Sequence, residues 1–69
     1  MNSQVINLAA FEKNPSDMYS GLYFTVCVWD ADINDCVGKV YRSSDGNKMR
    51  ALAMKMSKER GLELMDETY

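Results

Sequence analysis

The strongest hydrophobic pattern in the chain lies at its centre, where two runs of strand-forming residues flank a turn. Residues 22–30 read Leu-Tyr-Phe-Thr-Val-Cys-Val-Trp-Asp, a run rich in β-branched and aromatic side chains without glycine or proline. Asp32, Ile33 and Asn34 supply turn chemistry, and residues 36–42 then resume the apolar character. The pattern predicts an antiparallel hairpin with a loop of two to four residues centred between Asp32 and Ile33.

An unbroken register through this hairpin places large apolar side chains on both faces. The predicted pairs are Trp29 with Cys36, Thr25 with Val40 and Tyr23 with Arg42 on one face, and Val28 with Val37 and Phe24 with Tyr41 on the other. Cys27 then lies opposite Gly38 and only diagonal to Cys36. This arrangement disfavours a disulfide between the two cysteines.

Helical periodicity follows the hairpin over residues 47–60. Residues 43–45 read Ser-Ser-Asp and offer an N-cap, and Gly61 is placed to end the helix in a left-handed conformation. The apolar positions recur at helical spacing and form one stripe: Met49, Leu52, Ala53 and Met56. We therefore expect an amphipathic helix that packs its apolar stripe on one face of the hairpin.

The two ends of the chain carry weaker signals. Residues 4–11 fit a strand or a short helix, and we favour the strand. Residues 62–65 could form a short closing strand before an acidic tail at 66–69. The expected fold is α+β, a small antiparallel β-sheet of two to three strands around the central hairpin, packed against one C-terminal amphipathic α-helix. Residues 1–69 form one small domain in which the first 20 residues are the least well predicted.

Composition limits the size of the core and points to an ordinary globular protein. The chain has 69 residues, of which 46% are hydrophobic and 26% charged. A domain of this length buries only about 60% of its unfolded surface, so a homodimer is a natural way to gain stability. Two cysteines are too few for a disulfide scaffold, and no signal peptide or membrane-spanning run is visible. We expect reduced thiols, no membrane association and a cytoplasmic location.

Charge is distributed unevenly along the sequence. Residues 38–60 hold seven basic residues against two acidic ones, whereas the remainder holds one basic residue against eight acidic ones. The basic side chains that could contact nucleic acid or an acidic partner are Lys39, Lys48, Arg50, Lys55 and Lys58. A nucleic-acid-binding accessory domain is therefore an alternative function, although a pI near 4.9 argues against it.

The residues offer no recognisable catalytic machinery. Histidine is absent, and the four glycines are scattered rather than gathered into a phosphate loop. Residues 30–35 resemble the start of a calcium loop, but the sixth position is Asp35 and the twelfth is Tyr41 where glycine and glutamate are needed. A weak cation site, or a metal-dependent enzyme built on Asp30, Asp32 and Asp35, is only a minor alternative. We predict no cofactor, no metal site and no enzymatic activity.

The most informative feature is that the predicted hairpin has two apolar faces, whereas the sequence predicts only one helix to cover them. One helix covers only one face of the hairpin, so the other face must be covered by the N-terminal segment, by a second copy or by another protein. The residues predicted to bind a partner are Tyr23, Trp29, Val40, Arg42 and Met54. We expect a non-enzymatic protein–protein interaction module, a small regulator or inhibitor of a larger protein machine. In size and composition alone, the chain is similar to small acidic accessory proteins of bacteriophages and mobile elements, which include inhibitors of this kind.

Overall fold

The computed structural model describes residues 3–12 and 21–68. In this part of the chain four strands and one helix follow one another in the order β1, β2, β3, α1, β4. Their bounds are Gln4–Glu12 for β1, Leu22–Asp30 for β2, Asp35–Ser43 for β3, Gly46–Arg60 for α1 and Glu63–Glu67 for β4. The α+β class predicted from the sequence is confirmed.

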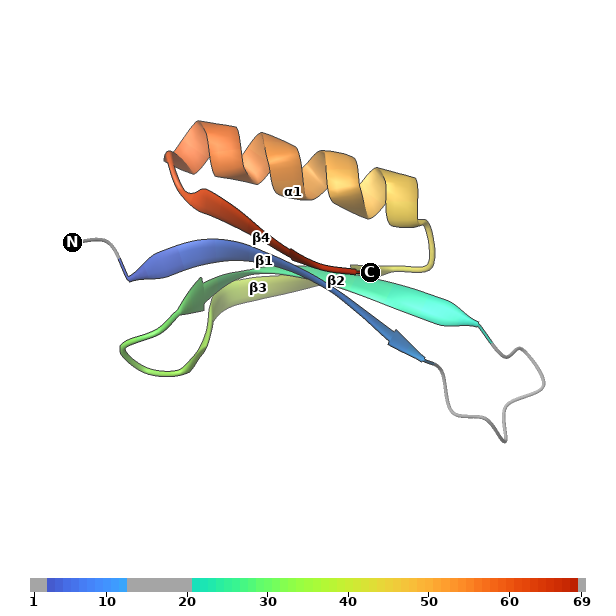
Figure 1. The fold of residues 1–69 in the computed structure, drawn as a ribbon, viewed down its shortest axis with the longest axis horizontal. Helices are drawn as coiled ribbons and strands as arrows, with labels where there is room; N and C mark the ends of the chain where they lie inside the picture. The colour runs from blue at the N-terminus through green and yellow to red at the C-terminus, as the bar shows by residue number, and fades with distance from the viewer. Residues whose placement is uncertain (1–2, 13–20, 69) are drawn as a thin grey trace.

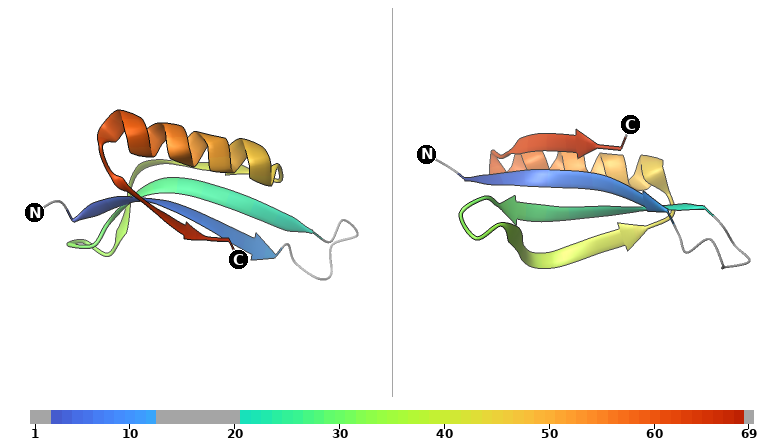
Figure 2. Two further views of the ribbon diagram at one scale, coloured as in Figure 1. Left: turned by 45° about the horizontal axis from the view of Figure 1, so that its top comes forward. Right: turned by 60° about the horizontal axis from the view of Figure 1, so that its bottom comes forward.

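The strands form one mixed sheet in the order β3-β2-β1-β4, and α1 lies across one of its faces (Figures 1 and 2). β1 and β3 each pair antiparallel with β2, whereas β4 pairs parallel with β1. The prediction of an antiparallel sheet of two to three strands is therefore wrong in detail. The parallel pair arises because α1 carries the chain back along the sheet before β4 begins, as a parallel connection requires.

The central hairpin keeps the predicted register near its loop and loses it further along. Trp29 lies opposite Cys36 and Val28 opposite Val37, as expected, but the register shifts between Val26 and Val28. Beyond the shift Thr25 pairs with Arg42 instead of Val40, and Phe24 with Ser43 instead of Tyr41.

The shift lies where β3 contains Gly38, whose φ of 78° belongs to the left-handed region. Such a residue interrupts the strand as a bulge does. The pairing moves by two residues, so side chains keep their alternation, and Arg42 stays on the face shared by Tyr23 and Trp29.

The helix ends where the sequence predicts and begins one residue earlier than predicted, at Gly46. The side chain of Asp45 accepts a hydrogen bond from the backbone N–H of Lys48 at 3.1 Å, and Gly61 closes the helix with φ 64°. The buried stripe of α1 consists of Met49, Ala53 and Met56. It packs in one core with Ile6 and Leu8 of β1, Val26 and Val28 of β2, and Leu62, which directly precedes β4. Phe24 and Tyr41 pack at the margin of this core, so the face of Val26 and Val28 is the one that α1 covers.

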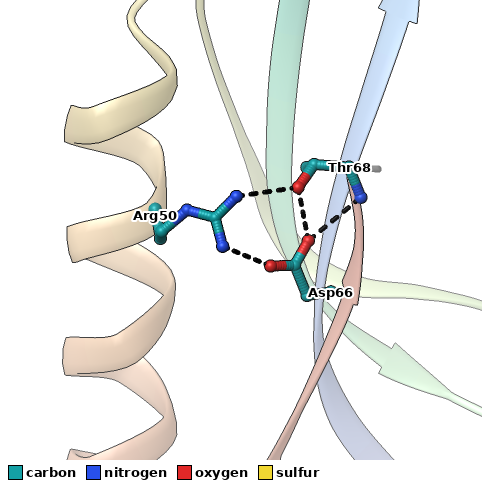
Figure 3. A network of polar contacts seen from close by, with 3 residues as sticks. All are labelled: Arg50, Asp66 and Thr68. Carbon is teal, nitrogen blue, oxygen red and sulfur yellow. Dashed lines mark hydrogen bonds and ion pairs between the residues drawn. The ribbon is translucent and has the colours of Figure 1, made fainter.

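A polar network joins α1 to β4 (Figure 3). The Arg50 guanidinium forms an ion pair with Asp66 and donates to the Thr68 hydroxyl at 2.9 Å. Hydrogen bonds from the Thr68 hydroxyl and backbone N–H, with a further contribution from Arg50, lower the pKa of Asp66. The first two residues of the predicted acidic tail therefore belong to β4, and one of them helps to hold that strand under the helix.

Candidate functional site

The face of the sheet opposite α1 is bare of any described element, and we call it the helix-free face (right-hand view of Figure 2). Side chains alternate along each strand, and the strand registers determine which of them share this face. Its members are Val5, Asn7, Ala9 and Phe11 of β1, Tyr23, Thr25, Cys27 and Trp29 of β2, Cys36 and Arg42 of β3, and Glu63, Met65 and Glu67 of β4.

The registers arrange these side chains in rows that cross the strands. One row runs Cys36, Trp29, Val5, Glu63 from β3 to β4, and the next contains Cys27, Asn7 and Met65. A third row runs Arg42, Thr25, Ala9, Glu67. This third row has a cation at the β3 edge of the sheet and a carboxylate at the β4 edge. The Asn7 amide donates a hydrogen bond to the Glu67 carboxylate at 3.2 Å and helps to hold it on this face.

An open, mainly apolar hollow of about 460 Å³ lies on the helix-free face. Its apolar lining includes Val5, Ala9, Phe11, Trp29 and Met65. Phe11 and Met65 remain 47% and 45% exposed, although both are large hydrophobic residues. A single domain normally buries side chains of this kind in clusters, so the hollow is suited to an apolar group from another molecule.

Aromatic rings and a guanidinium stack beside the hollow. The rings of Phe11 and Tyr23 are stacked with their centroids 5.4 Å apart, and Arg42 lies over the Tyr23 ring at 3.9 Å. Within the described residues no carboxylate pairs with Arg42. The Tyr23 ring therefore holds the Arg42 charge in place beside the hollow.

The two cysteines also lie on the helix-free face and are free thiols. Cys27 is buried and Cys36 half-buried. Burial raises the pKa of the Cys27 thiol to about 12, with smaller contributions from the hydrogen bond to Cys36, the charge of Cys36 and that of Asp35. Cys27 is therefore a packed, protonated thiol, which is the opposite of an activated nucleophile.

The structure brings together only part of the predicted partner-binding set. Tyr23, Trp29 and Arg42 share the helix-free face. Val40 lies in the interrupted stretch of β3 and is 48% exposed, while Met54 is 58% exposed on α1, which covers the other side of the sheet. Met54 therefore cannot contribute to the same patch as Trp29.

Three of the five basic residues predicted to contact nucleic acid already interact with other side chains of the protein. Arg50 is engaged with Asp66, Lys55 lies 4.0 Å from Glu59, and the Lys39 ammonium lies over the Tyr41 ring at 4.9 Å. Lys48 and Lys58 are basic residues of α1 as well. The surface predicted for nucleic acid thus has part of its charge already compensated within the molecule.

The carboxylates of the hairpin loop serve the local backbone. Asp30 accepts a hydrogen bond from the N–H of Asp32 at 2.9 Å, and Asp35 accepts one from the N–H of Cys36 at 2.7 Å. Among residues 3–12 and 21–68, no group of three or more side chains of the metal-ligating types lies close enough to hold an ion. In the same residues, no helix is both long and apolar enough to cross a membrane.

Of the residues that line the hollow, only Trp29 belonged to the predicted site. Val5 and Phe11 follow the alternation of residues 4–11, a signal that becomes usable only once this segment is known to be a strand. Met65 lies in a five-residue strand whose position depends on pairing with β1.

Comparison of the chain with protein-family models, curated proteins and solved structures found no match.

Proposed function

We propose that this protein is a non-enzymatic protein–protein interaction module, a small regulator or inhibitor of a larger protein machine, and that it binds through the helix-free face. The observation that carries the proposal is the apolar hollow on a sheet face that α1 leaves bare.

The composition of the face supports this function. Tryptophan, tyrosine and arginine are the residues that most often dominate binding energy, and Trp29, Tyr23 and Arg42 lie here on one rigid sheet. The surrounding apolar side chains contribute roughly 25 cal/mol for each Å² removed from water. Strands hold these groups in place before binding, so little conformational entropy is lost when a partner docks.

The test is capture of a partner from the native host's lysate with tagged protein, with and without nuclease, followed by mass spectrometry. We expect a stoichiometric protein that survives nuclease and is lost with Trp29→Ala. Ile33→Ala is the matched control, because Ile33 is also a large exposed apolar residue, at 61%, but lies in the hairpin loop outside the helix-free face.

Two results would contradict the proposal. Loss of every captured protein after nuclease treatment would favour the nucleic-acid-binding alternative through the basic residues of α1. Equal capture by the wild type and by Trp29→Ala, with both folded, would show that the partner uses another surface.

A further inference from the structure

The charges of the helix-free face are arranged so that the face is complementary to a copy of itself. Arg42 lies on the β3 edge and Glu67 on the β4 edge, at opposite ends of one row across the sheet. The order β3-β2-β1-β4 puts the centre of the sheet between β2 and β1. A two-fold axis there, running along the strands, places β3 of one copy over β4 of the other.

This axis preserves the position of each row along the strands. Arg42 of one copy consequently faces Glu67 of the other, and the contact is made twice because a two-fold interface is isologous. In the middle of the interface Trp29 faces Val5, and Tyr23 faces Phe11, so apolar groups meet apolar groups. The remaining acidic residue of the face, Glu63, meets Cys36.

The other face-to-face arrangement, with the axis across the strands, is disfavoured by the same charges. It stacks β4 of one copy on β4 of the other, which brings the Glu63 and Glu67 carboxylates of both copies to one edge. Like charges that face one another in this way oppose association. Electrostatics therefore selects the axis that runs along the strands.

The available area is sufficient for a weak dimer. With strands about 4.8 Å apart and about 3.3 Å per residue, the face covers about 500 Å² in each copy. The pair then buries about 1,000 Å², near the lower limit for a specific interface. The aligned packing of two twisted sheets, about 30° apart, is a common arrangement and accommodates long side chains such as arginine and glutamate.

We propose that a second copy of this chain covers the helix-free face of the free protein, with Arg42 of each copy paired with Glu67 of the other. The inference rests on the proposed function in one respect, that this face is a docking surface. A heterologous partner that uses the face then competes with the second copy.

Analytical ultracentrifugation of the purified full chain from about 1 to 500 µM tests the dimer, over the affinity range expected of so small an interface. We expect concentration-dependent dimerisation of the wild type. Arg42→Glu and Glu67→Arg should each weaken it about tenfold or more, because each variant places two like-charged pairs across the interface.

An equimolar mixture of the two variants provides the decisive measurement. In the mixed dimer the two substituted side chains face each other, as an introduced glutamate and an introduced arginine. The second contact pairs the native Glu67 of one chain with the native Arg42 of the other. Both contacts are again complementary, so native mass spectrometry should show the heterodimer in excess. Glu63→Arg is the matched control, since it places the same charge on β4 in the wrong row. Mixed with Arg42→Glu, it should not restore the dimer.

The outcomes separate this inference from the proposed function. The inference is overturned if the wild-type chain stays monomeric over the whole concentration range, or if neither charge reversal weakens the dimer. Neither result bears on the proposed function, which is still tested by partner capture from lysate. A dimer that shows the mixing rescue, without capture dependent on Trp29, upholds the inference and rejects binding of a different partner protein through the helix-free face. Circular dichroism of each variant confirms that loss of dimer is not loss of fold.

Discussion

At the scale of single residues, the two cysteines differ in burial although both lie on the same face of one sheet. Cys27 lies near the centre of β2 with only 3% of its surface exposed, whereas Cys36 lies near the start of the outer strand β3 and is half-buried. Neighbouring side chains remove water from Cys27, and an ionised thiolate there would lose solvation without gaining a cation. The raised pKa of Cys27 follows from this position.

We predict that Cys27 makes stability fall with pH in the alkaline range. Its thiol has the ordinary pKa of 9.0 in the unfolded chain, whereas burial raises this pKa to about 12 in the folded protein. Between these values the unfolded state binds fewer protons, so its contribution is complete below about pH 9 and is lost as the pH rises toward 12.

Urea unfolding of the wild type and Cys27→Ala at a series of pH values measures this effect. The difference in unfolding free energy between the two proteins should shrink or reverse as the pH rises above 9. A difference independent of pH would show that Cys27 ionises equally in both states. The comparison cancels the tyrosine and lysine titrations that the two proteins share.

At the scale of elements, the sequence predicted what local signals determine. The hairpin loop, the capping Asp45, the apolar stripe of α1 and the terminal Gly61 all lie where expected. Each of these depends on residues within a few positions of one another. The prediction of a strand over residues 4–11 is confirmed by β1, which extends one residue further.

The misses share one physical cause, since they depend on pairing between segments distant in the sequence. The sequence leaves a short strand at residues 62–65 open, because so few residues cannot decide it; β4 forms at Glu63–Glu67, where β1 offers it an edge. The register shift in β3 depends on how Gly38 is accommodated against β2. The hollow on the helix-free face is lined by residues of β1, β2 and β4, which come together only through such pairing. Trp29 is therefore the only lining residue that was predicted as part of the site.

We predict that Gly38→Ala destabilises the protein by about 1 kcal/mol, because an alanine must adopt the left-handed conformation there. The cost is conformational, since a Cβ at this position would meet nothing within 4 Å. Gly21→Ala is the matched control, because Gly21 has equally open space and no positive φ. Equal unfolding free energies for the two variants in urea would contradict the assigned role of Gly38.

At the scale of the whole molecule, apolar surface is divided between a core and a binding face. The two are separated by the thickness of one sheet. Ile6 points to α1 and is completely buried, while its neighbour Val5 lines the open hollow. Substitutions on the two faces should therefore affect different properties.

We predict that Ile6→Ala costs roughly 2–5 kcal/mol of unfolding free energy, as large-to-small changes in cores do. Trp29→Ala should cost less than about 3 kcal/mol, because the larger side chain is only half-buried. Thermal or urea unfolding at low protein concentration, where association does not contribute, measures both. A larger loss for Trp29→Ala would place this residue in the core and remove it from the binding face.

The parallel pairing of β1 with β4 also has a consequence for how the protein is made. Val5 lies beside Glu63, so β1 receives its second neighbour only after the central hairpin and α1 have been synthesised. The hairpin and α1 can form from nearby residues, but the sheet stays one strand short until β4 has been synthesised. We therefore expect the native fold to be completed after synthesis has passed β4, in a step whose rate reflects closure of this long loop.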